Sequence, residues 1–117
     1  MALPSEIVAR QSCVEYCGNT CYWQSDIDAA LNKGYSLYQE GETEGSNDYP
    51  HAEENYENLP FAVSGPYQEF PILNSFKVYT GGDPGADRVV FNTDGEFAAL
   101  VTHTGASGDD FVSCSQA

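Results

Sequence analysis

The sequence predicts an α+β fold, in which one α-helix packs on a central antiparallel β-sheet and two disulfides staple the domain. Three observations support this prediction. A single helical segment is followed by short strand-like segments with no second helix between them. The length of 117 residues suits one domain with a modest core. The four cysteines, an even number in a short chain, indicate two disulfides and a secreted protein.

The helix is expected to begin at Ser25, because the run Ser25-Asp26-Ile27-Asp28 has the pattern of a capping box. Apolar side chains then recur at helical spacing and should form a buried stripe, made by Ile27, Leu31, Tyr35 and Tyr38. Gly34 should weaken this helix by about 1 kcal/mol relative to alanine. Gly41 is expected to end it.

The remainder of the chain is predicted to be loop and strand. Residues 41–58 are rich in Gly, Ser, Asn and Glu, which is typical of a loop. Strands are expected at residues 67–73, 77–79, 87–92, 97–103 and 111–113, with a turn at Asp94-Gly95. Residues 1–12 are expected to form a flexible N-terminal arm before the domain of residues 13–117.

Strand alternation predicts which polar side chains meet. Successive side chains of a strand point to opposite faces of the sheet. Three of the predicted strands each carry one chemically versatile residue that alternates with a pair of residues expected to face the helix. The pairs are Phe70 and Ile72 for Glu69, Val89 and Phe91 for Arg88, and Leu100 and Thr102 for His103. Glu69, Arg88 and His103 should therefore gather on the face opposite the helix, and this polar face is the predicted active site.

The net charge of −14, with only four cations, argues against general nucleic-acid binding. Long-range forces on a polyanion would be repulsive, so any chemistry on RNA must rest on a local site. The cysteines have no histidine beside them and a CxxxC spacing, so neither a zinc site nor a cofactor is predicted. No apolar run is long enough to predict a membrane-spanning helix.

The residues of the predicted site suit cleavage of RNA by transesterification without a metal. Glu69 can be the base that removes the proton of the ribose 2′-hydroxyl, and His103 can be the acid that protonates the leaving 5′-oxygen. Arg88 has a planar fork that matches phosphate oxygens. His51 can assist as a second charged group or base, and Tyr49 can donate from its hydroxyl.

Each of these residues also has an alternative interpretation without a catalytic role. A histidine followed by Thr-Gly is usually a surface turn residue, Arg88 could pair with Asp87, and Glu69 could be one more acidic residue. These non-catalytic interpretations become less convincing when the residues are considered together. The set contains the chain's two histidines and one of its four cations.

Several short motifs occur along the chain, each once and in a specific order. They are the Cys-x3-Cys-x3-Cys run of residues 13–21, Gly-Ser-Asn at 45–47, Tyr-Pro-His at 49–51, Asn-Tyr-Glu at 55–57, Glu-Phe-Pro-Ile at 69–72, Gly-Gly-x-Pro-Gly-Ala-Asp-Arg-Val at 81–89 and Thr-His-Thr-Gly-Ala-Ser-Gly at 102–108. Over residues 13–115 the chain resembles the fungal guanyl-specific ribonucleases of the ribonuclease T1 family. This resemblance implies the microbial ribonuclease fold.

The resemblance also implies catalytic roles. The residues that match the family's catalytic positions are His51, Glu69, Arg88, His103, Tyr49 and Phe111. In this set Glu69 is the base and His103 is the acid. Tyr49 matches the family's phosphate-side tyrosine, and Phe111 matches the apolar residue that packs beside the reacting phosphate. The family's disulfide pattern implies the pairs Cys13–Cys21 and Cys17–Cys114.

Residues 55–57 match the family's guanine loop. The resemblance implies that backbone amides of Asn55, Tyr56 and Glu57 read the acceptor edge of the base. The Tyr56 ring stacks on the base, and the Glu57 carboxylate accepts hydrogen bonds from the base N–H groups. Asp109 stands where the family usually has Asn, and it contributes mainly a backbone carbonyl.

Glu53 and Glu54 depart from the family pattern just before this loop. The family typically has an aromatic residue followed by Asn at these two positions. Glu53 therefore replaces one of two aromatic faces that sandwich guanine. Because stacking of a base on an aromatic ring is worth roughly 1–3 kcal/mol, the base preference is expected to be altered.

These inferences predict a secreted, extracellular endoribonuclease that cleaves single-stranded RNA 3′ to guanosine, through a 2′,3′-cyclic phosphate. It is expected to be a monomer that needs no cofactor and acts on neither DNA nor membranes. The alternative is a ribonuclease-like secreted effector or toxin with little or no catalysis that binds a host partner. The acidic guanine loop motivates that alternative, whereas the complete catalytic set favours the enzyme.

Overall fold

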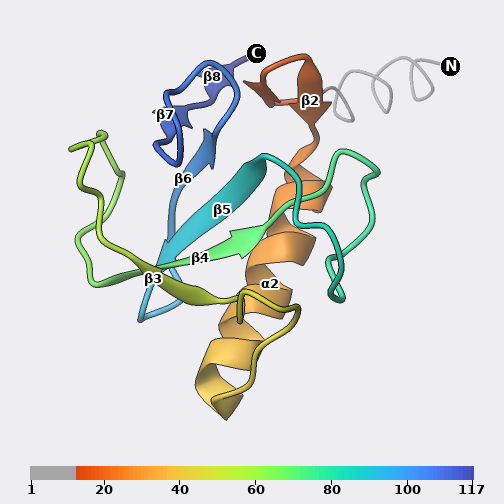
Figure 1. Cartoon of the computed structure of the whole chain (residues 1–117), viewed down its shortest axis with the longest axis vertical. Coiled ribbons are helices and arrows are strands. Elements are labelled where there is room, and N and C mark those ends of the chain that lie inside the picture. Colours follow the sequence, from red (N-terminus) through yellow and green to blue (C-terminus); the bar gives the residue numbers. More distant parts are fainter. Residues whose placement is uncertain (1–12) are drawn as a thin grey trace, which may run out of the picture.

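The computed structural model describes residues 13–117, so the predicted N-terminal arm of residues 1–12 lies outside the described residues. Within them, one helix packs on a five-stranded antiparallel sheet of order β3-β4-β5-β6-β7, and a small sheet has the order β2-β1-β8 (Figure 1). The elements are β1 (Glu15–Cys17), β2 (Thr20–Tyr22), α2 (Gln24–Glu40), β3 (His51–Glu53), β4 (Tyr67–Pro71), β5 (Asp87–Asn92), β6 (Phe97–Thr102), β7 (Val112–Ser113) and β8 (Ser115–Gln116). The predicted α+β fold class is confirmed.

Helix α2 begins at Gln24, earlier than the capping box at Ser25 predicts. The backbone N–H of Trp23 donates to the Asp26 carboxylate at 2.9 Å, so Asp26 has the role that the sequence pattern gave to Asp28. The helix ends as predicted at Gly41, which adopts the left-handed conformation with φ of +68°.

The buried stripe of α2 differs from the predicted one. Its buried residues are Ile27, Ala30, Gly34 and Leu37. Gly34 belongs to this face because a Cβ there would lie 2.9 Å from both Phe70 and Phe91. The glycine that weakens the helix locally is thus required by the close approach of the helix to the sheet.

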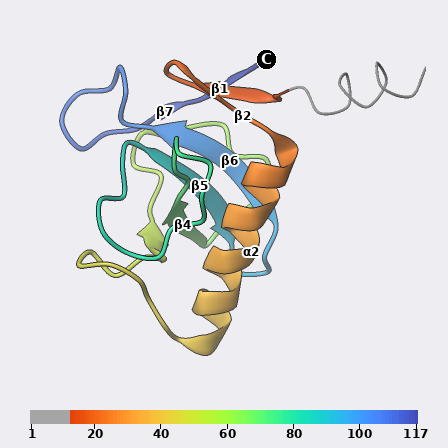
Figure 2. The same ribbon diagram turned by 90° about the vertical axis from the view of Figure 1, so that its right-hand side faces the viewer.

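The two faces of the sheet carry different side chains, as strand alternation predicts. The face toward α2 holds the main core, which includes Phe70, Val89, Phe91 and Leu100. Figure 2 shows α2 lying along this side of β4, β5 and β6. The other face carries a smaller apolar cluster of Val90, Ala98, Val101 and Phe111, together with Glu69 and Arg88.

Several predicted strand boundaries are wrong. Residues 77–79 form no strand, because the chain turns at Phe76, whose φ is +65°. Tyr79 nevertheless lies in the core at 1% exposure, with its hydroxyl donating to the Gly82 carbonyl at 2.9 Å. Strand β4 ends at Pro71 and β6 at Thr102, each earlier than predicted.

Three short strands lie where no strand was predicted: β1, β2 and β8, which form the small sheet. Strand β3 also lies inside the segment predicted as loop, and it pairs with β4 in the register His51↔Glu69. These strands are only two or three residues long, which is too short for hydrophobic alternation to identify.

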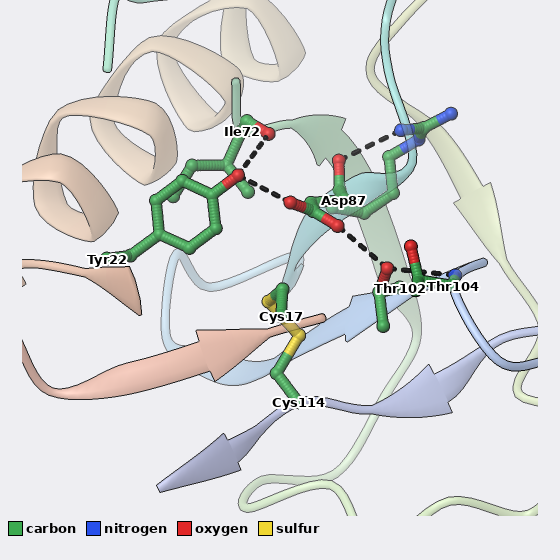
Figure 3. Close-up of a disulfide and its surroundings, with 8 residues drawn as sticks. Cys17, Tyr22, Ile72, Asp87, Thr102, Thr104 and Cys114 are labelled. Atoms are coloured by element: carbon green, nitrogen blue, oxygen red, sulfur yellow. Dashed lines mark hydrogen bonds between the residues drawn. A yellow bond between two sulfur atoms is a disulfide. The ribbon is translucent and has the colours of Figure 1, made fainter. Parts of the chain in front are cut away.

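Both implied disulfides are confirmed. Cys13–Cys21 closes the β1–β2 hairpin, and Cys17–Cys114 joins that hairpin to the segment before β8. The second bridge spans 97 residues, and loop-closure entropy puts such a crosslink at about 4–5 kcal/mol. It lies beside buried polar groups of β5 and β6 (Figure 3). No helix of the described residues has the length and apolarity that crossing a bilayer requires.

Candidate active site

Glu69 lies at the centre of the polar face of the sheet. It projects from β4, is 6% exposed, and stands between His51 on β3 and Arg88 on β5. Its Oε1 is 3.0 Å from His51 Nε2, and its Oε2 is 3.3 Å from Arg88 Nε. Strand pairing therefore assembles a carboxylate between two cationic groups, as alternation predicts for Glu69 and Arg88. We call Glu69, His51, Arg88 and Tyr49 the Glu69 cluster.

The partners of His51 fix its protonation. Nδ1 lies 2.9 Å from the Asn47 carbonyl oxygen, which can only accept, so Nδ1 carries a proton. Nε2 faces a Glu69 oxygen, and one proton lies between these two groups. The hydrogen bond to Glu69 raises the pKa of His51, and partial burial opposes this effect. The ring is therefore protonated to a larger fraction at neutral pH than an ordinary histidine.

Arg88 is buried, with 3% exposure, and hydrogen bonds hold its guanidinium in place. Its Nη1 donates to the carbonyls of Gly85 and Asp87 at 2.9 Å each, and to that of Pro84 at 3.3 Å. In the Pro-Gly-Ala-Asp-Arg motif, backbone carbonyls of the loop and of the first residue of β5 thus hold the arginine side chain in place. Nε lacks hydrogen-bond geometry to any described residue, so its contact with Glu69 is an ion pair without a hydrogen bond.

Tyr49 connects the cationic groups. Its hydroxyl accepts from Arg88 Nη2 at 2.9 Å, and the guanidinium carbon lies 5.0 Å from its ring centre. The same ring stacks on His51 with centroids 4.5 Å apart. Tyr49 is itself 5% exposed, so it positions both cations from within the core.

His103 is not a strand residue, which corrects the alternation argument for this position. Strand β6 ends at Thr102, and His103 begins the following turn with its N–H donating to the Ala86 carbonyl at 2.9 Å. It makes no hydrogen bond or ion pair with the Glu69 cluster among the described residues. The strand register brings it to the same end of the sheet, because Thr102 pairs with Asp87 and with Val112.

The His103 ring is oriented by two contacts. Nδ1 donates to the Asp110 carbonyl at 2.8 Å, and the ring stacks on Phe111 with centroids 4.1 Å apart and planes 21° apart. Nε2 has no hydrogen-bond partner within residues 13–117. Nε2 of this half-exposed residue is therefore the ring nitrogen available to exchange a proton with a bound molecule.

The predicted guanine loop of residues 55–57 is braced by its own polar groups. Asn55 has φ of +55°, and its side chain both donates to the Leu59 carbonyl at 3.0 Å and accepts from the Leu59 N–H at 2.7 Å. Tyr56 is 89% exposed, so its ring is open to a stacking partner. Glu57 Oε2 accepts the backbone N–H of Phe111 at 2.7 Å, a contact that the sequence did not predict.

Asp109 and Glu53 differ in their surroundings. Asp109 is exposed and its side chain makes no hydrogen bond to another described residue. Glu53 is 9% exposed, and its carboxylate accepts the backbone N–H of Asn55. Burial raises the pKa of Glu53, the Asn55 hydrogen bond lowers it, and nearby carboxylates raise it, for a net upward shift.

A buried polar network under the site was missed by the sequence analysis. The Asp87 carboxylate accepts from the Tyr22 hydroxyl at 2.5 Å and from the Thr102 hydroxyl at 2.7 Å (Figure 3). Burial, followed by this hydrogen bond, raises the pKa of Tyr22. Asp87 lies next to Arg88 and links β2, β5 and β6. The one available signal was an aspartate at the start of a strand whose centre, Val89 to Phe91, is apolar.

Within residues 13–117, no three His, Cys, Asp or Glu side chains are grouped so that they could hold a metal ion. The arrangement instead offers an acid–base pair of side chains, Glu69 and His103, with fixed cations at Arg88 and His51. Such a set can move two protons and stabilise a phosphoryl group.

Comparisons with known proteins show which proteins this chain resembles. A family model described as ribonuclease matches residues 10–115. Guanyl-specific ribonuclease Ms of Aspergillus phoenicis is 60% identical over 105 residues, which cover 90% of this chain and 98% of that protein. Guanyl-specific ribonuclease T1 of Aspergillus oryzae is 54% identical over 114 residues, covering 97% and 86%. A solved ribonuclease from Hericium erinaceus, RNase He1, is 39% identical with a TM-score of 0.64, covering 86% of this chain and 97% of that one.

Proposed function

Because this chain belongs to the ribonuclease family of the fungal guanyl-specific T1-type enzymes, we propose that it is a guanyl-specific endoribonuclease. Its reaction is cleavage of single-stranded RNA on the 3′ side of guanosine, with a 2′,3′-cyclic phosphate as the product of the first step. The observation that carries this proposal is Glu69 held between two cations, with His103 Nε2 unpartnered among the described residues.

In the first step, the Glu69 carboxylate takes the proton of the ribose 2′-hydroxyl. The 2′-oxygen forms a bond to phosphorus, and the bond from phosphorus to the 5′-oxygen breaks. His103 gives the proton on Nε2 to that leaving oxygen. Proton donor and acceptor are therefore different residues on different elements, which suits attack and departure on opposite sides of the phosphorus.

The cations of the Glu69 cluster stabilise the charge that develops on the phosphoryl oxygens. Arg88 and the His51 imidazolium are held in place by carbonyls and by Tyr49 before substrate binds. Because they are already oriented, little reorganisation accompanies the reaction. Phe111 supports this arrangement by stacking on the His103 ring.

Guanine recognition belongs to the loop of residues 55–57. The backbone amides offer donors to the acceptor edge of the base, and the exposed Tyr56 ring offers a stacking surface. The Glu57 carboxylate accepts from the base N–H groups, with its position set by the hydrogen bond from Phe111. The Asp109 carbonyl completes the set.

The chemistry and composition also bear on partners and location. DNA has no 2′-hydroxyl and so lacks the nucleophile of this reaction, which makes RNA the substrate. The net charge of −14 opposes self-association and favours a monomer. Two disulfides fit an oxidising environment, so we place the protein outside the cell.

The test is product analysis with the dinucleoside phosphates GpC, ApC, UpC and CpC. We expect GpC to be cleaved in preference, yielding guanosine 2′,3′-cyclic phosphate and cytidine. Glu69→Ala and His103→Ala proteins are the matched negative controls. Undiminished cleavage by either folded variant would remove that residue from the mechanism.

The alternative function as a non-catalytic effector or toxin is not favoured. The chain matches guanyl-specific ribonucleases over most of its length, and the catalytic residues expected from that resemblance are all present. A folded protein that cleaves none of the four dinucleoside phosphates would revive that alternative.

A further inference from the structure

Glu53 is a buried carboxylate without a cationic partner. Its residue is 9% exposed at the end of β3, and no lysine or arginine within the described residues forms an ion pair with it. The groups that face it are also acidic or neutral: Glu54 and Glu57 from its own segment, Glu69 from β4, and Tyr67, its partner in the sheet register. A carboxylate in such surroundings needs a strong hydrogen bond.

That hydrogen bond comes from the backbone N–H of Asn55. The orientation of this amide does not depend on Glu53, because the Asn55 side chain bridges both polar groups of Leu59 and the Asn55 carbonyl accepts from Asn58 at 2.9 Å. The loop would therefore keep its shape, and the amide its direction, if the carboxylate were absent.

The amide that Glu53 occupies is one that the proposed function assigns to the base. A backbone N–H has a single proton, so it cannot make a full hydrogen bond to both a carboxylate and a nucleobase acceptor. A hydrogen bond to an ionised carboxylate is also roughly twice as strong as one to a neutral carbonyl. The carboxylate thus stands where the acceptor edge of guanine would bind.

We propose that Glu53 is a base-recognition residue that limits guanine affinity by competing with the base for the Asn55 N–H. This inference rests on the proposed guanyl specificity. Its consequence is a pH-dependent recognition loop, because a protonated Glu53 is a weaker competitor and no longer repels the acceptor atoms of the base. The net rise in its pKa brings this change closer to neutral pH than for an ordinary glutamate.

The test is calorimetric binding of guanosine, which has no phosphate, to four proteins: the wild type, Glu53→Gln, Glu53→Met and Glu54→Gln. Gln keeps an uncharged acceptor, and Met keeps length and apolar bulk without one. We expect Glu53→Gln to bind guanosine about fivefold and Glu53→Met about tenfold more tightly at neutral pH. Glu54→Gln removes the same charge from an exposed neighbour and should change affinity by less than about twofold.

The pH dependence gives a second arm. The ratio of the guanosine affinity of Glu53→Met to that of the wild type should fall toward one as pH falls through the Glu53 pKa. Taking this ratio cancels the titration of groups that both proteins share. Equal gains in Glu53→Gln and Glu54→Gln would mean that only general charge matters, which overturns the competition. Weaker guanosine binding by Glu53→Met would show that Glu53 supports the loop, which also overturns it.

An NMR measurement on the free protein separates this inference from the proposed function. The Asn55 amide proton should shift with pH as Glu53 titrates, and that transition should vanish in Glu53→Gln and persist in Glu54→Gln. If the wild type shows this transition but neither binds guanosine nor cleaves GpC, the Glu53–Asn55 contact exists and the proposed guanyl specificity is refuted. A wild type that cleaves GpC preferentially but lacks the transition would refute the role of Glu53 alone.

Discussion

In the Glu69 cluster, the proposed catalytic groups Glu69, His51 and Arg88 come from three neighbouring strands and contact one another between elements. The proposed guanine loop is instead braced at Asn55 by contacts within one short segment, with one longer-range hydrogen bond from Phe111 to Glu57. Glu69 and Arg88 are nearly buried, and they contact each other, His51 and Tyr49, which lie far apart along the chain. In the loop, Asn55 is bound to Leu59 four residues later, and Tyr56 is 89% exposed.

This difference separates catalysis from recognition. The sheet can hold Glu69, His51 and Arg88 in one geometry whatever the loop sequence is, since none of the hydrogen bonds and ion pairs described for them involves residues 54–58. The loop reaches the catalytic side through the Glu57–Phe111 hydrogen bond, beside the His103 ring. The loop in turn presents backbone amides, whose availability depends on its immediate neighbours. An acidic replacement such as Glu53 can therefore alter base binding while leaving the chemistry of the sheet in place.

The largest expected effect is on turnover, from changes in the proton-transferring residues. We expect Glu69→Gln and His103→Ala each to lower kcat for GpC by about 10² to 10⁴-fold, because each removes one proton-transfer group. Guanosine affinity should change little, since neither residue belongs to the loop. Steady-state kinetics with GpC and calorimetry with guanosine measure the two quantities, and an equal loss in both would break the separation.

The next effect concerns the support of the catalytic side. Asp87→Ala leaves the buried Thr102 hydroxyl without its acceptor and leaves the Tyr22 hydroxyl with the Ile72 carbonyl at 3.2 Å. We expect a loss of about 2–4 kcal/mol in the free energy of unfolding, measured by urea denaturation. An Asp87→Ala protein that unfolds at the urea concentration of the wild type would show that the network contributes nothing to stability.

Tyr56→Ala is the matching change in the loop. Because the ring is exposed, the free energy of unfolding should change by less than about 0.5 kcal/mol. Guanosine affinity should fall about tenfold through the lost stacking surface. Unaltered guanosine binding in this variant would show that the base does not stack on Tyr56.

The smallest expected effect is a shift in one titration. The hydrogen bond to Glu69 raises the pKa of His51 in the folded protein above its ordinary value of 6.5. The stability that this pair contributes is fully present below pH 6.5 and is lost as pH rises through the raised pKa. An NMR titration of the His51 ring should show the raised value in the wild type. Glu69→Gln should return it toward 6.5, and an ordinary His51 pKa in the wild type would contradict the pairing.

The sequence predicted the catalytic face better than the loop, for a physical reason. Period-two alternation applies wherever a strand is long enough, so it placed Glu69 and Arg88 on the face opposite the helix. It failed for His103, because β6 ends one residue earlier and the ring is oriented by the Asp110 carbonyl and Phe111 instead.

Contacts made by backbone atoms were beyond prediction from residue types. The carbonyls that hold Arg88 and His51 exist in every residue, so no sequence signal marks them. The same is true of the Asn55 N–H that Glu53 occupies and the Phe111 N–H that Glu57 occupies. Their positions follow from loop conformations with positive φ, which only the folded chain reveals.

The central claim is that catalysis and base recognition reside in separable regions, and the ratio of kcat/KM for GpC to that for ApC tests it most directly. The ratio should be measured for the wild type, His51→Gln and Tyr56→Ala. We predict that His51→Gln lowers both rates and leaves the ratio unchanged, whereas Tyr56→Ala lowers the ratio. A His51→Gln protein whose ratio falls as far as that of Tyr56→Ala would contradict the separation.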